Sequence, residues 1–153
     1  GRSSGLTTCR LVDGTLGSTH MALTLVSLVD GHVDEHLHSY ETSFYVLEGA
    51  SYADEFGYDE ELTALAASHK NVTFVATCSR PQEPRNALWR GETGRVNTVV
   101  ERHVRQWALA LPETCIYCCG NPQMIEDVKA RLGASGFHVE AERFWKEDHK
   151  KHD

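Results

Sequence analysis

The chain has 153 residues, a length that fits one domain with one hydrophobic core and is too short for a two-domain flavoenzyme. Its 15 Lys and Arg residues against 22 Asp and Glu residues give a formal net charge of −7. This charge argues against binding to nucleic acid or to an anionic membrane, because both need a basic surface. The longest mostly apolar stretch, residues 21–29, is far shorter than the ~20 residues of a membrane-spanning helix, and no signal peptide is recognisable. Five cysteines, an odd number, favour a reducing compartment, so we expect a cytoplasmic protein.

The first 49 residues predict a β-rich arm. Residues 1–17 are rich in Gly, Ser and Thr and are expected to form a loop. Residues 20–29 place β-branched and large apolar side chains in a run of strand length, which the turn residues Asp30 and Gly31 end. Residues 43–48 form a second run of this kind, so the pattern predicts a β-hairpin.

From residue 50 onwards, apolar side chains switch between helical spacing and short buried runs. The expected order is a helix at 58–66, a strand at 71–77, an irregular loop at 78–94, a helix at 96–111, a strand at 115–119, a helix at 122–133 and a strand at 137–144. This alternation predicts an α/β fold with a partial doubly wound parallel sheet and right-handed crossovers. The charged residues 146–153 are expected to form a solvated tail.

The stretch at residues 119–124 follows a predicted strand and opens a predicted helix. Gly120 would let a ligand approach the backbone, and the free N–H groups of a helix that starts near Asn121 and Pro122 would favour a negative group such as phosphate. The alternative is ordinary turn and capping chemistry without a ligand.

Two arginines strengthen the phosphate hypothesis. Ser79 and Arg80 follow another strand end, and Arg95 stands at the close of the long loop. Two guanidinium groups and a hydroxyl group around one strand end would suit a phosphate monoester, because arginine offers a fork of donors to phosphate oxygens. The alternative is that both arginines are ordinary surface residues.

Five segments, in this order and spacing, resemble the NADP-binding lobe of bacterial ferredoxin–NADP reductases: residues 52–58, 78–81, 93–95, 119–124 and 142–145. The resemblance runs from about residue 44 to residue 145. It implies that Ser79 and Arg80 bind the 2′-phosphate of NADP(H), with Arg95 as a second cationic contact. It also implies that Cys119 and Gly120 lie beside the nicotinamide.

Two parts of such a reductase are expected to be missing. One is the flavin-binding β-barrel that would precede the lobe, and the other is the first, central strand of the lobe, because residues 13–17 lack a strong apolar strand before them. Without the flavin-binding barrel, FAD would have to come from a separate chain. The resemblance also matches Trp145 to an aromatic residue that lies near the flavin in relatives. We therefore expect a truncated lobe at residues 50–145 that is not catalytic alone.

Residues 31–49 resemble the first motif of the cupin family, and the match extends back to residue 17. In cupins a His-x-His pair, an acidic residue and a later histidine bind a divalent metal, which implies metal-ligand roles for His36 and His38. Thr42 stands in the position of the cupin glutamate, and the second cupin motif is not present. A functional metal site and a purely structural role both stay open.

The sequence therefore predicts a chimera of a cupin-like β arm at residues 1–49 and the reductase-type lobe. The leading function is binding of NADP(H) as part of a flavin-dependent oxidoreductase. The alternatives are a cupin-derived module that binds a metal or a small ligand, and a recombined structural chain that is stable only as a homo-oligomer. The arm at residues 21–29 is also expected to supply a substitute strand to the sheet.

Overall fold

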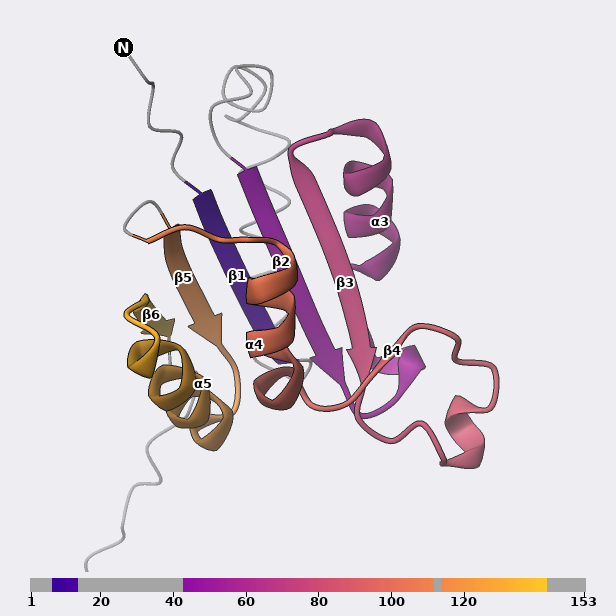
Figure 1. Ribbon diagram of the computed structural model, residues 1–153. Helices are drawn as coiled ribbons and strands as arrows, with labels where there is room; N and C mark the ends of the chain where they lie inside the picture. Colours follow the sequence, from indigo (N-terminus) through magenta and orange to yellow (C-terminus); the bar gives the residue numbers. More distant parts are fainter. Residues whose placement is uncertain (1–6, 14–42, 112–113, 143–153) are drawn as a thin grey trace, which may run out of the picture.

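A six-stranded, wholly parallel sheet forms the centre of the molecule (Figure 1). The structure is a computed structural model that describes residues 7–13, 43–111 and 114–142. The strand order is β4-β3-β2-β1-β5-β6, and every neighbouring pair is parallel. No helix in these described ranges is long and apolar enough to cross a membrane.

The strands are β1 (Thr7–Asp13), β2 (Ser43–Ala50), β3 (Val72–Cys78), β4 (Glu92–Thr93), β5 (Thr114–Cys119) and β6 (His138–Glu142). The α-helices are α3 (Asp59–Ser68), α4 (Val96–Gln106) and α5 (Pro122–Ala134), and two 3-10 turns, η1 (Ala53–Glu55) and η2 (Pro84–Asn86), lie in the loops.

Strand β1 corrects two sequence-based predictions. Residues 7–13 were expected to be part of a loop, and the first strand of the lobe was expected to be missing. The structure places β1 in the middle of the sheet, where Thr7 pairs with Ser43 of β2 on one side and with Thr114 of β5 on the other. The prediction failed because polar side chains interrupt this strand, and pairing along both edges, rather than its own hydrophobicity, defines it.

The expected boundary between an arm at 1–49 and a lobe at 50–145 falls inside β2. Residues 44–49 pair with both β1 and β3, so they belong to the same sheet as the rest of the lobe. The place in the sheet that residues 21–29 were expected to fill is held by β1. The first run of the predicted hairpin, residues 20–29, lies outside the described residues, and its second run, residues 43–48, forms part of β2 in the parallel sheet.

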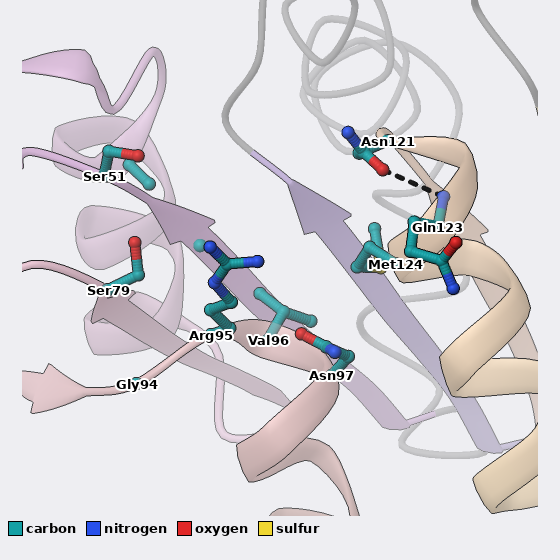
Figure 2. Close-up of a pocket in the computed structure, with 11 residues that line it drawn as sticks. Ser51, Ser79, Gly94, Arg95, Val96, Asn97, Asn121, Gln123 and Met124 are labelled. Carbon is teal, nitrogen blue, oxygen red and sulfur yellow. Dashed lines mark hydrogen bonds between the residues drawn. The ribbon is translucent and has the colours of Figure 1, made fainter.

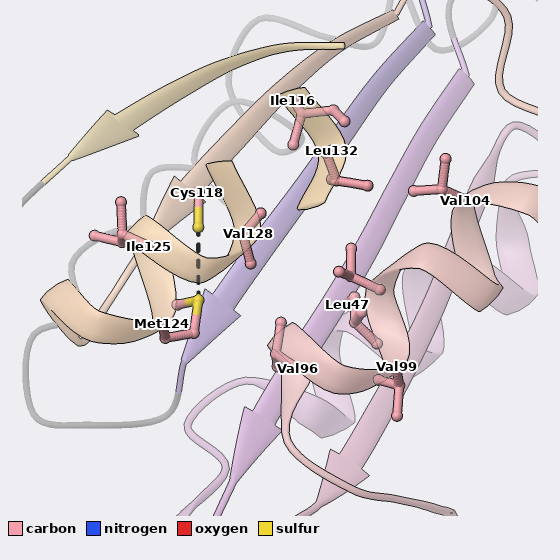
Figure 3. Close-up of a cluster of buried hydrophobic side chains, with 11 residues drawn as sticks. Leu47, Val96, Val99, Val104, Ile116, Cys118, Met124, Ile125, Val128 and Leu132 are labelled. Atoms are coloured by element: carbon pink, nitrogen blue, oxygen red, sulfur yellow. Dashed lines mark hydrogen bonds between the residues drawn. The ribbon is translucent and has the colours of Figure 1, made fainter. Parts of the chain in front are cut away.

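Neighbouring side chains on β2 point to opposite faces of the sheet and begin two separate cores. Val46 packs with Leu62 of α3 on one face. Leu47 packs on the other face with side chains from α4, β5 and α5 (Figure 3). Since successive side chains on a strand point to opposite faces, these two contacts show that helices cover β2 on both sides. Parallel sheets are usually covered in this way.

The second half of the chain confirms most of the predicted elements, with one helix shorter than expected. The helix predicted at residues 96–111 ends at Gln106, since Trp107 caps it and Ala108 takes a left-handed φ of 52°. Leu111, expected on the buried face of that helix, is instead exposed. The helix from Pro122 and the flanking strands form as predicted.

Candidate functional site

The carboxyl ends of the strands border a cavity of about 300 Å³ (Figure 2). Gly49, Ala50 and Ser51 line it from the end of β2, and Ser79 lines it from the end of β3. The remaining lining residues come from the starts of α4 and α5. Parallel strands end at the same edge of a sheet, so segments distant in sequence meet there.

The strand order reverses at β1, because β2, β3 and β4 follow on one side of it and β5 and β6 on the other. A crevice opens at such a reversal, since consecutive crossovers leave the sheet in opposite directions. The cavity spans this place, with walls from β2 on one side and from the start of α5 on the other. Its position is therefore the one where open α/β sheets bind ligands.

The start of α4 faces the cavity without a side-chain cap. Arg95 is the N-cap residue, and no side chain in the described part of the protein caps this helix. The first N–H groups of a helix lack partners within the helix and carry partial positive charge, so they favour an anion. The Arg95 guanidinium group points into the same space (Figure 2). No carboxylate among the described residues forms an ion pair with it.

The start of α5 forms the opposite wall. Asn121 caps this helix, because its Oδ1 accepts a hydrogen bond of 2.8 Å from the backbone N–H of Gln123 (Figure 2). Gly120, just before the cap, has a φ of 137°, a conformation that side chains other than glycine rarely adopt. The predicted junction of strand, glycine and helix is therefore present, with the expected capping chemistry.

A hydrogen bond between α4 and α5 fixes one side of the cavity. Asn97, which lines the cavity, donates from Nδ2 to Oδ2 of Asp127 on α5. This bond lowers the pKa of Asp127, and the nearby Arg131 lowers it further. The first turn of α4 is thus held against α5 by a charged acceptor.

Arg80 flanks the cavity rather than lining it. Its Nη1 donates a hydrogen bond of 3.0 Å to the hydroxyl oxygen of Tyr52, and its Cζ lies 5.5 Å from the centre of the Tyr52 ring. Arg85 lies closer to the same ring, at 4.1 Å, and is neutralised by Asp54 at 2.7 Å and Glu55 at 3.3 Å. No carboxylate in the described ranges pairs with Arg80, so of these two arginines it is the one that offers an unneutralised charge.

Three of the site residues expected from the sequence line the same cavity: Ser79, Arg95 and Asn121. Cys119 is 0% exposed at the end of β5, so its side chain presents no surface to the cavity. Gly120 and Pro122 belong to the turn and the first helical residue beside Asn121. Trp145, His36 and His38 lie outside the described residues.

Several residues that line the cavity were not predicted from the sequence. Gly49 was read as the end of a strand, although a glycine in that place is also a signal of close backbone approach. Ser51 and Asn97 carry no signal in the sequence, because only the fold brings them to the cavity. Gln123 lies in the stretch at residues 119–124 that the sequence singled out, although it was not predicted as a site residue itself. Within the described ranges, no group of three or more His, Cys, Asp or Glu side chains could hold a metal ion.

Comparison with known proteins agrees with this geometry. Residues 24–130 match the sequence model of the oxidoreductase NAD-binding domain family. The chain is 38% identical over 78 residues to a component of the Na(+)-translocating NADH-quinone reductase of Klebsiella pneumoniae, a match that covers 50% of this chain and 18% of that protein. It is 29% identical over 106 residues to ferredoxin–NADP reductase B of Sorangium cellulosum, a match that covers 65% of this chain and 42% of that protein. The chain thus spans less than half the length of these curated relatives.

Solved structures show the same fold. A ferredoxin NADP+ reductase from Neisseria gonorrhoeae with bound FAD and NADP superposes with a TM-score of 0.67 at 19% identity, over 92% of this chain and 57% of that one. The cytochrome b5 reductase domain of Ulva prolifera nitrate reductase gives a TM-score of 0.65 at 25% identity, over 91% of this chain and 48% of that one.

The match to the family begins at residue 24, inside the stretch that resembles a cupin. The cupin resemblance and the chimera stay predictions, whereas the resemblance to the nucleotide-binding lobe of reductases is confirmed. Since the match covers more than half of the sequence, the chain belongs to the oxidoreductase NAD-binding domain family.

Proposed function

We propose that the chain binds NADP(H) as the nucleotide-binding part of a flavin-dependent oxidoreductase of the ferredoxin–NADP reductase type. The observation that carries the proposal is the cavity at the strand ends, which joins an uncapped helix start to an arginine without a carboxylate partner among the described residues. An anionic ligand suits this combination, because the helix start and the guanidinium group both favour negative charge.

The adenosine 2′-phosphate of NADP(H) is the group that we assign to Ser79 and Arg80, with Arg95 as a second cationic contact. Ser79 supplies a hydroxyl group in the cavity, and the next residue in the chain supplies an unneutralised guanidinium group. A phosphate monoester can accept several charge-assisted hydrogen bonds from such a set. NAD(H) carries no phosphate at this position, so these residues would favour NADP(H).

The two curated relatives differ in the nucleotide for which they are named. One is named for NADH and the other for NADP. The arginine at position 80 is the feature of this chain that favours NADP(H), because a 2′-phosphate needs a cationic partner and a ribose hydroxyl group does not.

The flavin would be bound outside the described residues, by a separate chain or domain. When bound, it supplies the hydride exchange with the nicotinamide, while the residues of this chain bind and orient the nucleotide. Cys119, Gly120, Asn121 and Pro122 form the turn that we expect beside the nicotinamide, and Trp145 is the residue that we expect near the flavin. The chain alone is therefore proposed to bind nucleotide without catalysing electron transfer.

Calorimetric titration of the full chain with NADP+ and NAD+ tests the proposal. The Arg80→Ala, Arg95→Ala double variant should lose the preference for NADP+, since each charge-assisted phosphate contact is worth roughly ten- to hundredfold in affinity. Arg90→Ala is the matched control, because Arg90 is exposed and its Nη1 donates to the backbone oxygens of Ala87 and Trp89. An unchanged preference in the double variant would remove both arginines from the site.

The other functions predicted from the sequence stay predictions. A divalent metal held by His36 and His38, a homo-oligomer and a cytoplasmic location have no support from the described residues. Metal titration of a His36→Ala, His38→Ala variant against the unchanged protein would test the first of them.

A further inference from the structure

Asn86 is buried in a loop whose neighbouring side chains are exposed. It is 2% exposed, whereas Arg85 and Ala87 on either side face solvent. An amide side chain is rarely buried unless its polar atoms have partners. The burial of Asn86 therefore indicates that its side-chain amide has hydrogen-bond partners.

The Asn86 side chain binds three backbone groups, from the segments after β2 and after β3, at the edge of the cavity. Its Nδ2 donates to the backbone oxygen of Ser51 at 3.0 Å and to that of Arg80 at 2.8 Å. Its Oδ1 accepts a hydrogen bond of 2.9 Å from the backbone N–H of Ala53. Both donors and the acceptor of the amide are used, so only asparagine fits this position without loss.

The other end of Arg80 is held by Tyr52. The Tyr52 hydroxyl oxygen accepts from Arg80 Nη1 at 3.0 Å. Tyr52 itself stands between Ser51 and Ala53, the two residues whose backbones Asn86 binds. Arg80 is therefore fixed at its main chain by Asn86 and at its guanidinium group by Tyr52.

We propose that Asn86 and Tyr52 are positioning residues that hold Arg80 ready for a phosphate monoester and thereby set the preference of the cavity for NADP(H) over NAD(H). The proposal rests on the proposed function, which assigns the 2′-phosphate to Arg80. A free arginine side chain loses rotamer entropy when it binds a ligand, and an arginine that is already ordered loses less.

Hydrogen bonds that do not involve Asn86 hold the ends of β2 and β3 together, so the loss of Asn86 is expected to affect Arg80 selectively. The backbone N–H of Ser79 donates to Ala50 at 2.9 Å, and the Cys78 thiol donates to Ser51 at 3.1 Å. These bonds connect the ends of β2 and β3 without Asn86. Ser79 should therefore stay in the cavity when Asn86 is replaced.

The test compares the ratio of the NADP+ and NAD+ dissociation constants in the full chain, in Asn86→Ala and in Tyr52→Phe. Each variant should lower the preference for NADP+ by roughly two- to tenfold, the value of one or two hydrogen bonds. Leu88→Ala is the control, because Leu88 lies in the same loop and is 89% exposed. It should leave the ratio unchanged.

A double-variant cycle with Arg80→Ala separates positioning from a general effect on the fold. If the two residues act through Arg80, adding Asn86→Ala or Tyr52→Phe to Arg80→Ala should not change the ratio further. Two results would overturn the proposal. One is that Asn86→Ala and Tyr52→Phe weaken the binding of both nucleotides equally, and the other is that they change the ratio by the same factor in the Arg80→Ala variant.

The outcomes also separate this proposal from the proposed function. A chain that binds neither nucleotide, or binds both equally, overturns the two together. A preference for NADP+ that Arg80→Ala removes, but that Asn86→Ala and Tyr52→Phe leave intact, overturns only the positioning role. Should Asn86→Ala fail to fold, Tyr52→Phe decides alone, since it removes one hydroxyl group and keeps the ring.

Discussion

A Cβ atom on Gly49 would lie 2.3 Å from Cγ2 of Val96, so the first turn of α4 packs directly on the end of β2. Both residues line the cavity. The absence of a side chain at position 49 therefore sets how close the start of α4, with its unpaired N–H groups, comes to the strand ends.

Gly49→Ala should push α4 away from β2 and weaken nucleotide binding. Val96 is buried and has little room to move, so overpacking should also lower the free energy of unfolding by about 1–3 kcal/mol. Gly57→Ala is the control, because a Cβ there would meet nothing within 4 Å. Denaturant unfolding and nucleotide titration would check both variants, and a Gly49→Ala protein with unchanged affinity would contradict this role.

Asp127→Ala should weaken NADP+ and NAD+ binding by the same factor. The substitution releases Asn97, which lines the cavity, but it leaves Ser79, Arg80 and Arg95 in place. Titration with the two nucleotides gives the measurement. A change in the ratio of the two affinities would show instead that Asp127 acts on the 2′-phosphate.

The buried carboxyl group of Glu48 should make the protein less stable as the pH rises. It is 3% exposed, its Oε2 has no hydrogen-bond partner among the described residues, and burial raises its pKa from 4.5 to about 7. A backbone hydrogen bond from Gly57 lowers the pKa and the charge of Asp59 raises it, each by less than burial does. As the pH rises from 4.5 to about 7, the unfolded chain loses the Glu48 proton while the folded protein keeps it. The free energy of unfolding should therefore fall by about 3 kcal/mol over this range.

The matched variant for this prediction is Glu48→Gln, which cannot ionise. It should be more stable than the unchanged protein at pH 8 and of similar stability near pH 4.5. Chemical unfolding at a series of pH values gives the difference between the two proteins. A difference that does not depend on pH would show that Glu48 keeps an ordinary pKa.

His103 should have the opposite effect and make the protein less stable as the pH falls. Burial lowers the pKa of His103 below 6.5, the charge of Arg102 lowers it further, and Glu92, 3.3 Å away, only partly offsets them. The unfolded chain then binds the proton first as the pH falls through 6.5, so stability should be lost on the acid side. His103→Gln should remove this loss in unfolding experiments between pH 7 and pH 5, and an unchanged slope would refute the assignment.

The sequence predicted the second half of the fold well because its elements are locally consistent. The helix from Pro122 has a proline in its first turn, an asparagine cap and an apolar stripe, and the structure shows these features together. The placement of Ser79, Arg95 and Asn121 around one cavity also followed from a local rule, since each stands where a parallel strand ends or a helix begins.

Features that depend on distant pairing could not be predicted. Strand β1 is central only because β2 and β5 bind both of its edges. Helix α4 stops before Ala108, whose left-handed φ no sequence rule assigns to alanine. Asn86 is an ordinary loop residue in the sequence, and its importance appears only when the backbone groups of Ser51, Ala53 and Arg80 meet around its amide.

The most direct test of the account is an NMR titration of the full chain with NADP+, with NAD+ in parallel, that follows the backbone amides along the chain. We predict saturable shifts centred on Ser79, Arg95 and Asn121, with tighter binding of NADP+. Saturable shifts centred elsewhere, or no shifts in a folded sample, would contradict the claim that this cavity is the nucleotide site.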